Sequence, residues 1–327
     1  MVDVELLRLA EDIKLMRIRG AAEIGRAAAS GMKHYALSSK APDAASYIDG
    51  LNEAYRVLLN TRPTAVSLAN SLNYIRHRVL KAHKEGATLE VLRQVTVEAS
   101  DAFVATSYSA VKRISEFGAR RIRNGDLIMT HCNSSVAIST LLEAKRSGKE
   151  FSVIATETRP RFQGRITAKE LAEKGIPVTL IVDSAARYFM PKVDKVVVGS
   201  DVVTANGAVV NKIGTSLIAL AAKEARVRVY VCAETYKFSP STVMGELVEI
   251  EERPPTEVVP EEEIPLLGNV RIANPAFDVT PAEMIDAIIT ERGVIPPQAA
   301  ILILMEEFGY RIGEEYFGKV FVEEEGV

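Results

Sequence analysis

Residues that bind metals or form disulfides are scarce in this chain of 327 residues, which holds 2 cysteines and 4 histidines. No pair of them has the spacing of zinc ligands, so we expect no metal site. Two cysteines do not make the disulfide framework of a small secreted protein, and we expect both thiols to be free.

The sequence also lacks the common signatures of cofactor-binding and hydrolytic enzymes. It contains no G-x-G-x-x-G after a strand, no H-E-x-x-H and no G-x-S-x-G. The stretch 211–215 has the wrong glycine spacing for a phosphate-binding P-loop. We therefore expect no cofactor and chemistry carried out by side chains alone.

Excess charge and long apolar runs are absent as well. The formal net charge of -3 argues against nucleic acid as the main partner. No apolar run approaches the length that spans a membrane. Acidic residues, Asp3 and Glu5, stand near the start, where a secretion signal would be basic. We expect a cytoplasmic protein with neither a nucleic-acid nor a membrane partner.

Apolar residues recur at helical spacing through the first part of the chain, and no convincing strand interrupts them. After residue 119 short apolar runs alternate with helical patterns, which is typical of a parallel, doubly wound sheet. The sequence therefore predicts an α/β protein with a helical N-terminal domain, residues 1–118, and a sheet domain, residues 119–327. The predicted helices are 4–16, 21–32, 44–60, 65–85, 88–117, 136–146, 167–174 and 213–224, and the predicted strands are 127–130, 152–156, 178–182, 195–198 and 228–232.

Two later segments stand apart from this alternation. Residues 249–265 are acidic and rich in proline, which favours a solvated surface loop. Residues 280–316 return to helical, apolar patterns and are expected to cover the sheet.

Cys132 is the most informative residue of the sheet domain. It follows the strand 127–130, and Ser134 and Ser135 after it are suited to cap the next helix. In open α/β sheets, ligands bind in the crevice at the carboxyl ends of the strands. A helix amino terminus stabilises negative charge, so we expect the pKa of the Cys132 thiol to be lowered.

Other polar residues follow neighbouring strands and should converge on the same edge. Such a set suits an anionic, phosphorylated ligand with proton transfer at its centre. The residues concerned are Glu157, Arg159, Asp201, Asn211, Lys212, Glu234, Thr235 and Lys237.

Each of these residues has a purely structural alternative. Strand-end Asp and Asn side chains, Asp201 among them, often bind turn backbone or cap a helix. Arg159 could form a surface ion pair, and Cys132 could be a small buried hydrophobe. For His131 we favour a structural or ligand-contacting role over that of a base, and Cys232 fits a core position.

The helical part adds two arginine-containing breaks between helices. Residues 17–23 end one helix and open another, and its backbone N–H groups beside Arg19 would form a phosphate cradle. Residues 60–64, with Arg62, repeat the arrangement. The alternative for both is a helix–helix turn with solvated arginines.

Taken together, these segments resemble a superfamily that holds methylthioribose-1-phosphate isomerases, archaeal ribose-1,5-bisphosphate isomerases and the regulatory subunits of translation initiation factor 2B. The enzymes of that superfamily carry a Cys and Asp pair that the regulatory subunits typically lack, and this chain has both, as Cys132 and Asp201. The motifs that match are Arg19-Gly-Ala-Ala22, Asn60-Thr-Arg-Pro-Thr64, Thr130-His-Cys-Asn-Ser134, Glu157-Thr-Arg-Pro-Arg-Phe-Gln-Gly-Arg165, Gly199-Ser-Asp201 and Asn211-Lys-Ile-Gly-Thr215.

Among these families, the bisphosphate isomerases are the most similar in chain length and in the sequence of residues 131–135. The methylthioribose enzymes and a non-enzymatic regulatory subunit are the alternatives. The resemblance implies a Rossmann-like sheet domain, conversion of ribose 1,5-bisphosphate to ribulose 1,5-bisphosphate in nucleotide salvage, a dimer-based homohexamer and activation by AMP. We expect Cys132 and Asp201 to be catalytic. The expected substrate ligands are Arg19, Gly20, Ala21, Ala22, Arg62, Asn133, Ser134, Arg159, Asn211, Lys212 and Lys237.

Overall fold

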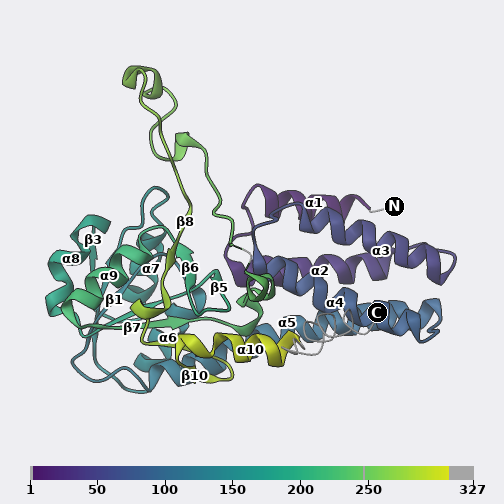
Figure 1. The fold of residues 1–327 in the computed structure, drawn as a ribbon, viewed down its shortest axis with the longest axis horizontal. Coiled ribbons are helices and arrows are strands. Elements are labelled where there is room, and N and C mark those ends of the chain that lie inside the picture. The colour runs from purple at the N-terminus through teal and green to yellow at the C-terminus, as the bar shows by residue number, and fades with distance from the viewer. Residues whose placement is uncertain (1–2, 246, 309–327) are drawn as a thin grey trace, which may run out of the picture.

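The N-terminal part of the molecule is a bundle of long helices, as the apolar spacing predicts. A computed structural model describes residues 3–245 and 247–308 (Figure 1). Side chains at three N-caps, Asp3, Asp43 and Thr88, accept a backbone N–H of the following turn. The helices are α1 (Val4–Lys14), α2 (Ala21–Ser38), α3 (Ala44–Leu59), α4 (Val66–Lys84) and α5 (Leu89–Ala119).

The second part contains a seven-stranded sheet in the order β10-β9-β7-β4-β1-β2-β3. All neighbouring strands pair in parallel except β9 and β10. The chain winds outward from β1 in both directions, so the predicted doubly wound sheet is confirmed. The strands are β1 (Leu127–Thr130), β2 (Ser152–Thr156), β3 (Val178–Ile181), β4 (Lys195–Val198), β7 (Arg228–Cys232), β9 (Ala287–Thr290) and β10 (Gly293–Ile295).

Helices cover both faces of this sheet because alternate strand residues point to opposite faces. Val196 belongs to one buried cluster and Val197 to the other. The first cluster includes apolar residues of α8 (Ala186–Phe189), α9 (Thr215–Ala225) and α10 (Ala300–Phe308), and the second includes those of α5, α6 (Ser135–Arg146) and α7 (Gln163–Glu173).

Two features differ from the sequence-based expectation. A small antiparallel sheet forms from β5 (Val202–Val203), β6 (Val209–Lys212) and β8 (Phe277–Thr280). The prediction of helix from residue 280 was wrong for β9 and β10. A short run of buried apolar residues fits a strand as well as a helix, so its pattern does not distinguish the two. Helix α10 confirms the predicted helix over residues 300–308, and residues 309–316 lie outside the described residues.

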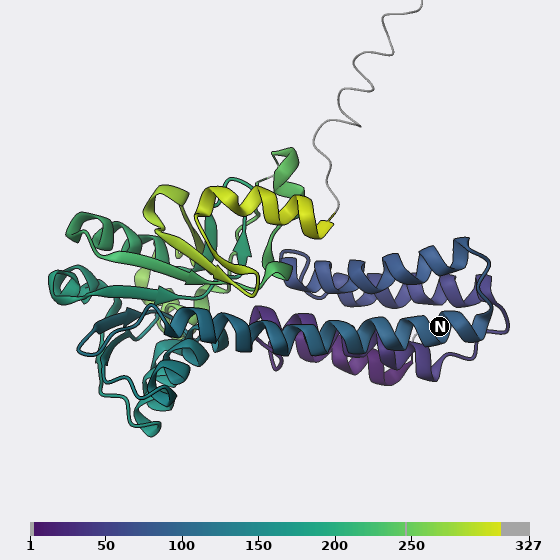
Figure 2. The same ribbon diagram turned by 90° about the horizontal axis from the view of Figure 1, so that it is seen from below.

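Helix α5 belongs to both parts of the molecule (Figure 2). It packs against α2 and α4 in the bundle and against α6 and β9 under the sheet. The boundary near residue 119 therefore stays a prediction, since this helix crosses it without a linker. The segment 249–276 leaves the body as a long excursion (Figure 1). In the part of the chain described, no helix is long and apolar enough to cross a membrane.

Candidate active site

A cavity lies beside the sheet at the point between β1 and β4 where the chain reverses its direction of winding. Ligand sites of open α/β sheets are found at such switch points. The residues after β1 and after β4 line one side of it, and the turns before α2 and α4 line the other. Its volume is ≈ 290 Å³, enough for a small phosphorylated sugar.

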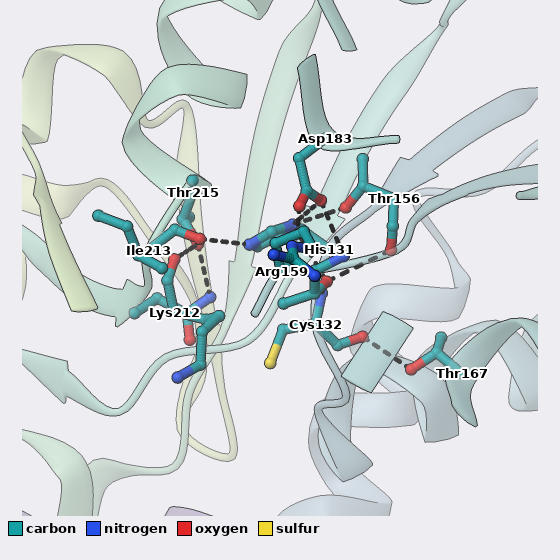
Figure 3. A network of polar contacts seen from close by, with 12 residues as sticks. His131, Cys132, Thr156, Arg159, Thr167, Asp183, Lys212, Ile213 and Thr215 are labelled. Carbon is teal, nitrogen blue, oxygen red and sulfur yellow. Dashed lines mark hydrogen bonds and ion pairs between the residues drawn. The ribbon is translucent and has the colours of Figure 1, made fainter. Parts of the chain in front are cut away.

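Cys132 stands in this cavity on a tightly held turn (Figure 3). Its backbone has a φ of 66°, the left-handed conformation that is uncommon for residues other than glycine. The Cys132 N–H donates to Thr158 Oγ1 at 2.9 Å, and its carbonyl accepts from Thr167 Oγ1 at 2.7 Å. Contacts from the turn after β2 and from α7 therefore fix the direction of the thiol.

His131 has a structural role, one of the two that we predicted. Its ring is buried, with Nδ1 2.6 Å from Thr156 Oγ1 and Nε2 2.8 Å from the carbonyl of Ile213. Figure 3 shows the Cys132 thiol pointing away from this ring and toward the side of Lys212. Cys232 is fully buried, as expected of a core residue.

Asp201 lines the same cavity from the turn after β4. Its N–H donates to the carbonyl of Val210 at 3.0 Å, which ties the turn to β6. The turn that carries Cys132 and the turn that carries Asp201 can approach each other because residue 199 is glycine. A Cβ at Gly199 would lie 2.1 Å from Ser134 Oγ. The thiol and the carboxyl group, 69 positions apart, thus face one space, as the sequence predicts.

The pKa values of these two groups depend mainly on their burial. Burial raises the pKa of Asp201 despite the nearby Lys237, Lys212 and Arg62, which shifts the carboxyl group toward its protonated form. Burial also raises the pKa of Cys132 to about 11, although Lys212 and the N–H of Asn133 act against it. The predicted lowering of the thiol pKa was wrong, because desolvation outweighs the helix terminus and the cations.

The helical wall of the cavity carries the first predicted phosphate cradle. Gly20 precedes α2 with a φ of 90° and has no side chain to cap the helix. The first-turn N–H groups of Ala21 and Ala22 therefore keep no partner within the helix. Arg19 stands beside them at the exposed rim. Arg62, from the turn before α4, lines the same wall with 12% of its side chain exposed.

Most of the remaining predicted ligands also reach the cavity. Lys212 lies with Nζ 4.7 Å from the ring centre of Phe277, and Asn211 donates to Thr215 Oγ1 at 3.0 Å. Lys237 is buried, with Nζ 2.6 Å from Glu234 Oε2. The predicted ligands that line the cavity are Arg19, Gly20, Ala21, Ala22, Arg62, Asn133, Ser134, Asn211, Lys212 and Lys237.

Arg159 does not line the cavity, contrary to the expectation. Its N–H donates to Asp183 Oδ2 at 2.7 Å, and its exposed guanidinium donates to the carbonyl of Val258 at 3.2 Å. Asp183, from the segment after β3, also accepts the N–H of Thr158 at 2.8 Å. These bonds turn the segment after β2 so that Arg159 faces the excursion rather than the cavity.

Some cavity residues were missed by the sequence reasoning. Gln163 lines the cavity because α7 begins earlier than predicted, and its Oε1 is buried without a hydrogen-bond partner. Glu251 and Arg253 also line it, although their segment was expected to be a solvated loop. The alternation of charge in Glu251-Glu-Arg253 was the available signal, but nothing in the sequence places it near Arg62.

The described residues contain no group of three or more His, Cys, Asp or Glu that could hold a metal ion. The cavity instead combines a thiol, a carboxyl group and several cationic side chains. Such a set can bind a phosphorylated anion and transfer protons within it.

A comparison with protein families matches residues 17–297 to the initiation factor 2 subunit family, IF-2B. The chain belongs to this family. In sequence it is 55% identical to ribose 1,5-bisphosphate isomerase of Thermococcus kodakarensis, over 94% of this chain and 96% of that protein. It is 57% identical to the protein of the same name from Pyrococcus furiosus, over 95% and 96%.

More distant family members carry other names. Methylthioribose-1-phosphate isomerase of Pelotomaculum thermopropionicum is 40% identical over 90% of this chain and 83% of that protein. The crystal structure of the translation initiation factor eIF-2B from Pyrococcus horikoshii superposes with a TM-score of 0.78 at 32% identity, covering 91% of this chain and 99% of that one. The family fold therefore accompanies more than one function.

Proposed function

We propose that this member of the family is an isomerase that converts ribose 1,5-bisphosphate to ribulose 1,5-bisphosphate in nucleotide salvage. The observation that carries the proposal is the presence of Cys132 and Asp201 in one cavity with cations on both walls. High identity to isomerases of that name over nearly the full length supports the choice of substrate.

The reaction needs one acid and one base because the anomeric oxygen of a sugar 1-phosphate is esterified. Asp201 gives its proton to the ring oxygen as the C1–O bond breaks. Cys132, as thiolate, removes the C2 proton, and the electrons of that C–H bond form the C1=C2 double bond of an enol phosphate. The thiol then returns the proton to C1, while the Asp201 carboxylate accepts the C2 hydroxyl proton and the ketone forms.

The protonation states of Cys132 and Asp201 constrain this assignment. The reactive form pairs a thiolate with a protonated carboxyl group, and with the Cys132 pKa at about 11 that form is a minor one at neutral pH. Lys212 and the Asn133 N–H lower the pKa of the Cys132 thiol, and burial raises the pKa of Asp201, which shifts its carboxyl group toward the protonated form. Each effect favours the reactive form over the reverse arrangement of the two charges.

The phosphate groups and hydroxyls of the substrate would be held by the walls of the cavity. The helix terminus at Gly20–Ala22 with Arg19 fits one phosphate. The remaining proposed ligands are Arg62, Asn133, Ser134, Asn211, Lys212 and Lys237. The AMP activation and the dimer-based homohexamer implied by the resemblance remain part of the proposal, as does a cytoplasmic location.

Methylthioribose-1-phosphate isomerase is the second candidate, since Met16, Ile24 and Val66 give the cavity apolar surface that could accept a thioether. A coupled assay with ribose 1,5-bisphosphate and methylthioribose 1-phosphate side by side, with and without AMP, separates the candidates. We expect turnover of the bisphosphate. Turnover of the thioether substrate alone would reverse the choice, and turnover of neither would favour a regulatory subunit.

A further inference from the structure

Arg62, a proposed substrate ligand, is already occupied by a carboxylate of the chain itself. Its guanidinium pairs with Glu251, which comes from the beginning of the excursion 249–276. Glu251 is 22% exposed and Arg62 12%, so the pair is largely withdrawn from bulk solvent. A ligand anion can engage Arg62 fully only if it shares or replaces this partner.

A second arginine, Arg253, meets the same carboxylate. Arg253 Nη1 lies 2.7 Å from Glu251 Oε1, while Arg62 approaches Oε2. The two guanidinium groups thus converge, one on each oxygen of a single carboxylate. Arg62, Glu251 and Arg253 all line the cavity.

The charges around this cluster favour an anion at its centre. Burial works to raise the pKa of Glu251, yet Arg253 and Arg62 outweigh it and the pKa is lowered, so the carboxylate is ionised. Arg253 Nη2 is also 3.3 Å from Glu257 Oε1, which in turn lies 3.4 Å from Arg161 Nη1. With three arginines against two glutamates, the cluster keeps a net positive charge.

Two guanidinium forks aimed at one point have the geometry that binds a phosphate well. Arginine pairs with phosphate oxygens as it does with a carboxylate, and a phosphate offers more oxygens and more charge. If a phosphate took the place of the Glu251 side chain, both guanidinium groups would stay compensated. Neither of these partly buried arginines would be left unpaired, which is the costly outcome in such exchanges.

We propose that Arg62 and Arg253 form a two-arginine clamp for one phosphate group of the substrate, in which the Glu251 carboxylate holds the place of that phosphate until the ligand displaces it. The clamp rests on the proposed function for the identity of the ligand. It assigns a binding role to Arg253 and makes Glu251 a competitor of the substrate.

Titration calorimetry of the full chain with inorganic phosphate and with ribulose 1,5-bisphosphate tests the clamp without requiring turnover. Glu251→Gln keeps the size of the side chain and removes its charge, and we expect affinity for both ligands to rise about tenfold. Arg253→Met removes one arm, and we expect affinity to fall about tenfold.

Matched controls separate the clamp from general electrostatics. Glu249→Gln neutralises a carboxylate of the same segment at the cavity. Arg161→Gln removes an arginine of the same cluster that does not line the cavity. Both controls should change the affinities less than twofold.

Affinity in Glu251→Gln that is unchanged, reduced or equal to that of Glu249→Gln overturns the proposal. Unchanged affinity in Arg253→Met also overturns it, and this variant decides the matter if the first does not fold. Phosphate affinities that follow the expected order in a protein inactive on both sugar phosphates would support the clamp and reject the proposed function. Turnover without these shifts would do the opposite.

Discussion

The two walls of the cavity differ in what they contribute. The sheet wall, formed by the ends of β1 and β4, presents Cys132 and Asp201, whose pKa values are both raised by burial. The helical wall presents Arg19 at the rim and backbone N–H groups at the start of α2. In the proposed mechanism the sheet wall supplies the reacting groups together with Lys212 and Lys237, while the helical wall supplies only groups that bind the substrate.

The largest expected effect is on the sheet wall. Cys132→Ser should lower kcat by about 10³–10⁴-fold with KM nearly unchanged, because a hydroxyl is a far weaker base than a thiolate at this position. Steady-state kinetics with ribose 1,5-bisphosphate measures both values. Near-normal turnover would remove Cys132 from the proton shuttle.

The next effect concerns the second reacting group and its dependence on pH. Because the reactive form pairs a thiolate with a protonated carboxyl group, kcat/KM should stop rising with pH once Asp201, whose pKa is raised by burial, begins to ionise, and it should fall above about pH 11. Asp201→Asn should lower kcat by about 10²–10³-fold.

The same variant should change the shape of the profile. With no carboxyl proton to lose, kcat/KM of Asp201→Asn should rise with pH through the neutral range toward the thiol pKa of about 11. A profile of the variant that stays flat would contradict the assignment of the two roles.

The helical wall should respond differently. Arg19→Met should raise KM about tenfold and change kcat little, since a rim arginine binds ground state and transition state alike. Arg17→Met is a matched control, because Arg17 pairs with Asp12 at 2.8 Å and does not line the cavity. A kcat loss in Arg19→Met as large as that of Asp201→Asn would break the comparison between the walls.

The smallest effects concern stability. Gly199→Ala should lower the free energy of unfolding by about 1–3 kcal/mol, because its Cβ would meet the Ser134 side chain at the contact between the β1 and β4 turns. Urea titration followed by circular dichroism measures the loss.

A pH-dependent stability should accompany it. The folded-state pKa of Cys132 is raised, so stability is fully present below the unfolded pKa and is lost as pH rises toward about 11. Cys132→Ser should lose part of this alkaline dependence and keep the part that comes from other buried groups, among them Cys232, whose pKa burial raises to about 12. If the free energy of unfolding depended on alkaline pH identically in the original protein and in Cys132→Ser, this would contradict the raised pKa of Cys132.

The strands that could be predicted from the sequence are the buried ones. The expected bounds of β1, β2, β4 and β7 coincide with those observed, because each is an apolar, largely β-branched run between polar turns. Strands β5, β6, β8, β9 and β10 were missed, since very short strands and strands inside a long apolar segment have no pattern that distinguishes them. Ten of the eleven expected substrate ligands line the cavity, because parallel strands and helix termini bring them there by topology.

The sequence by itself determined the alternation of strands and helices, and with it the edge at which Cys132 and Asp201 meet. Only the tertiary structure decided the pKa of the Cys132 thiol, the direction of the Arg159 side chain and the place of Glu251 between Arg62 and Arg253. Local patterns record which face of an element is buried. A pKa or an ion pair depends on desolvation and on charges that arrive from distant parts of the chain.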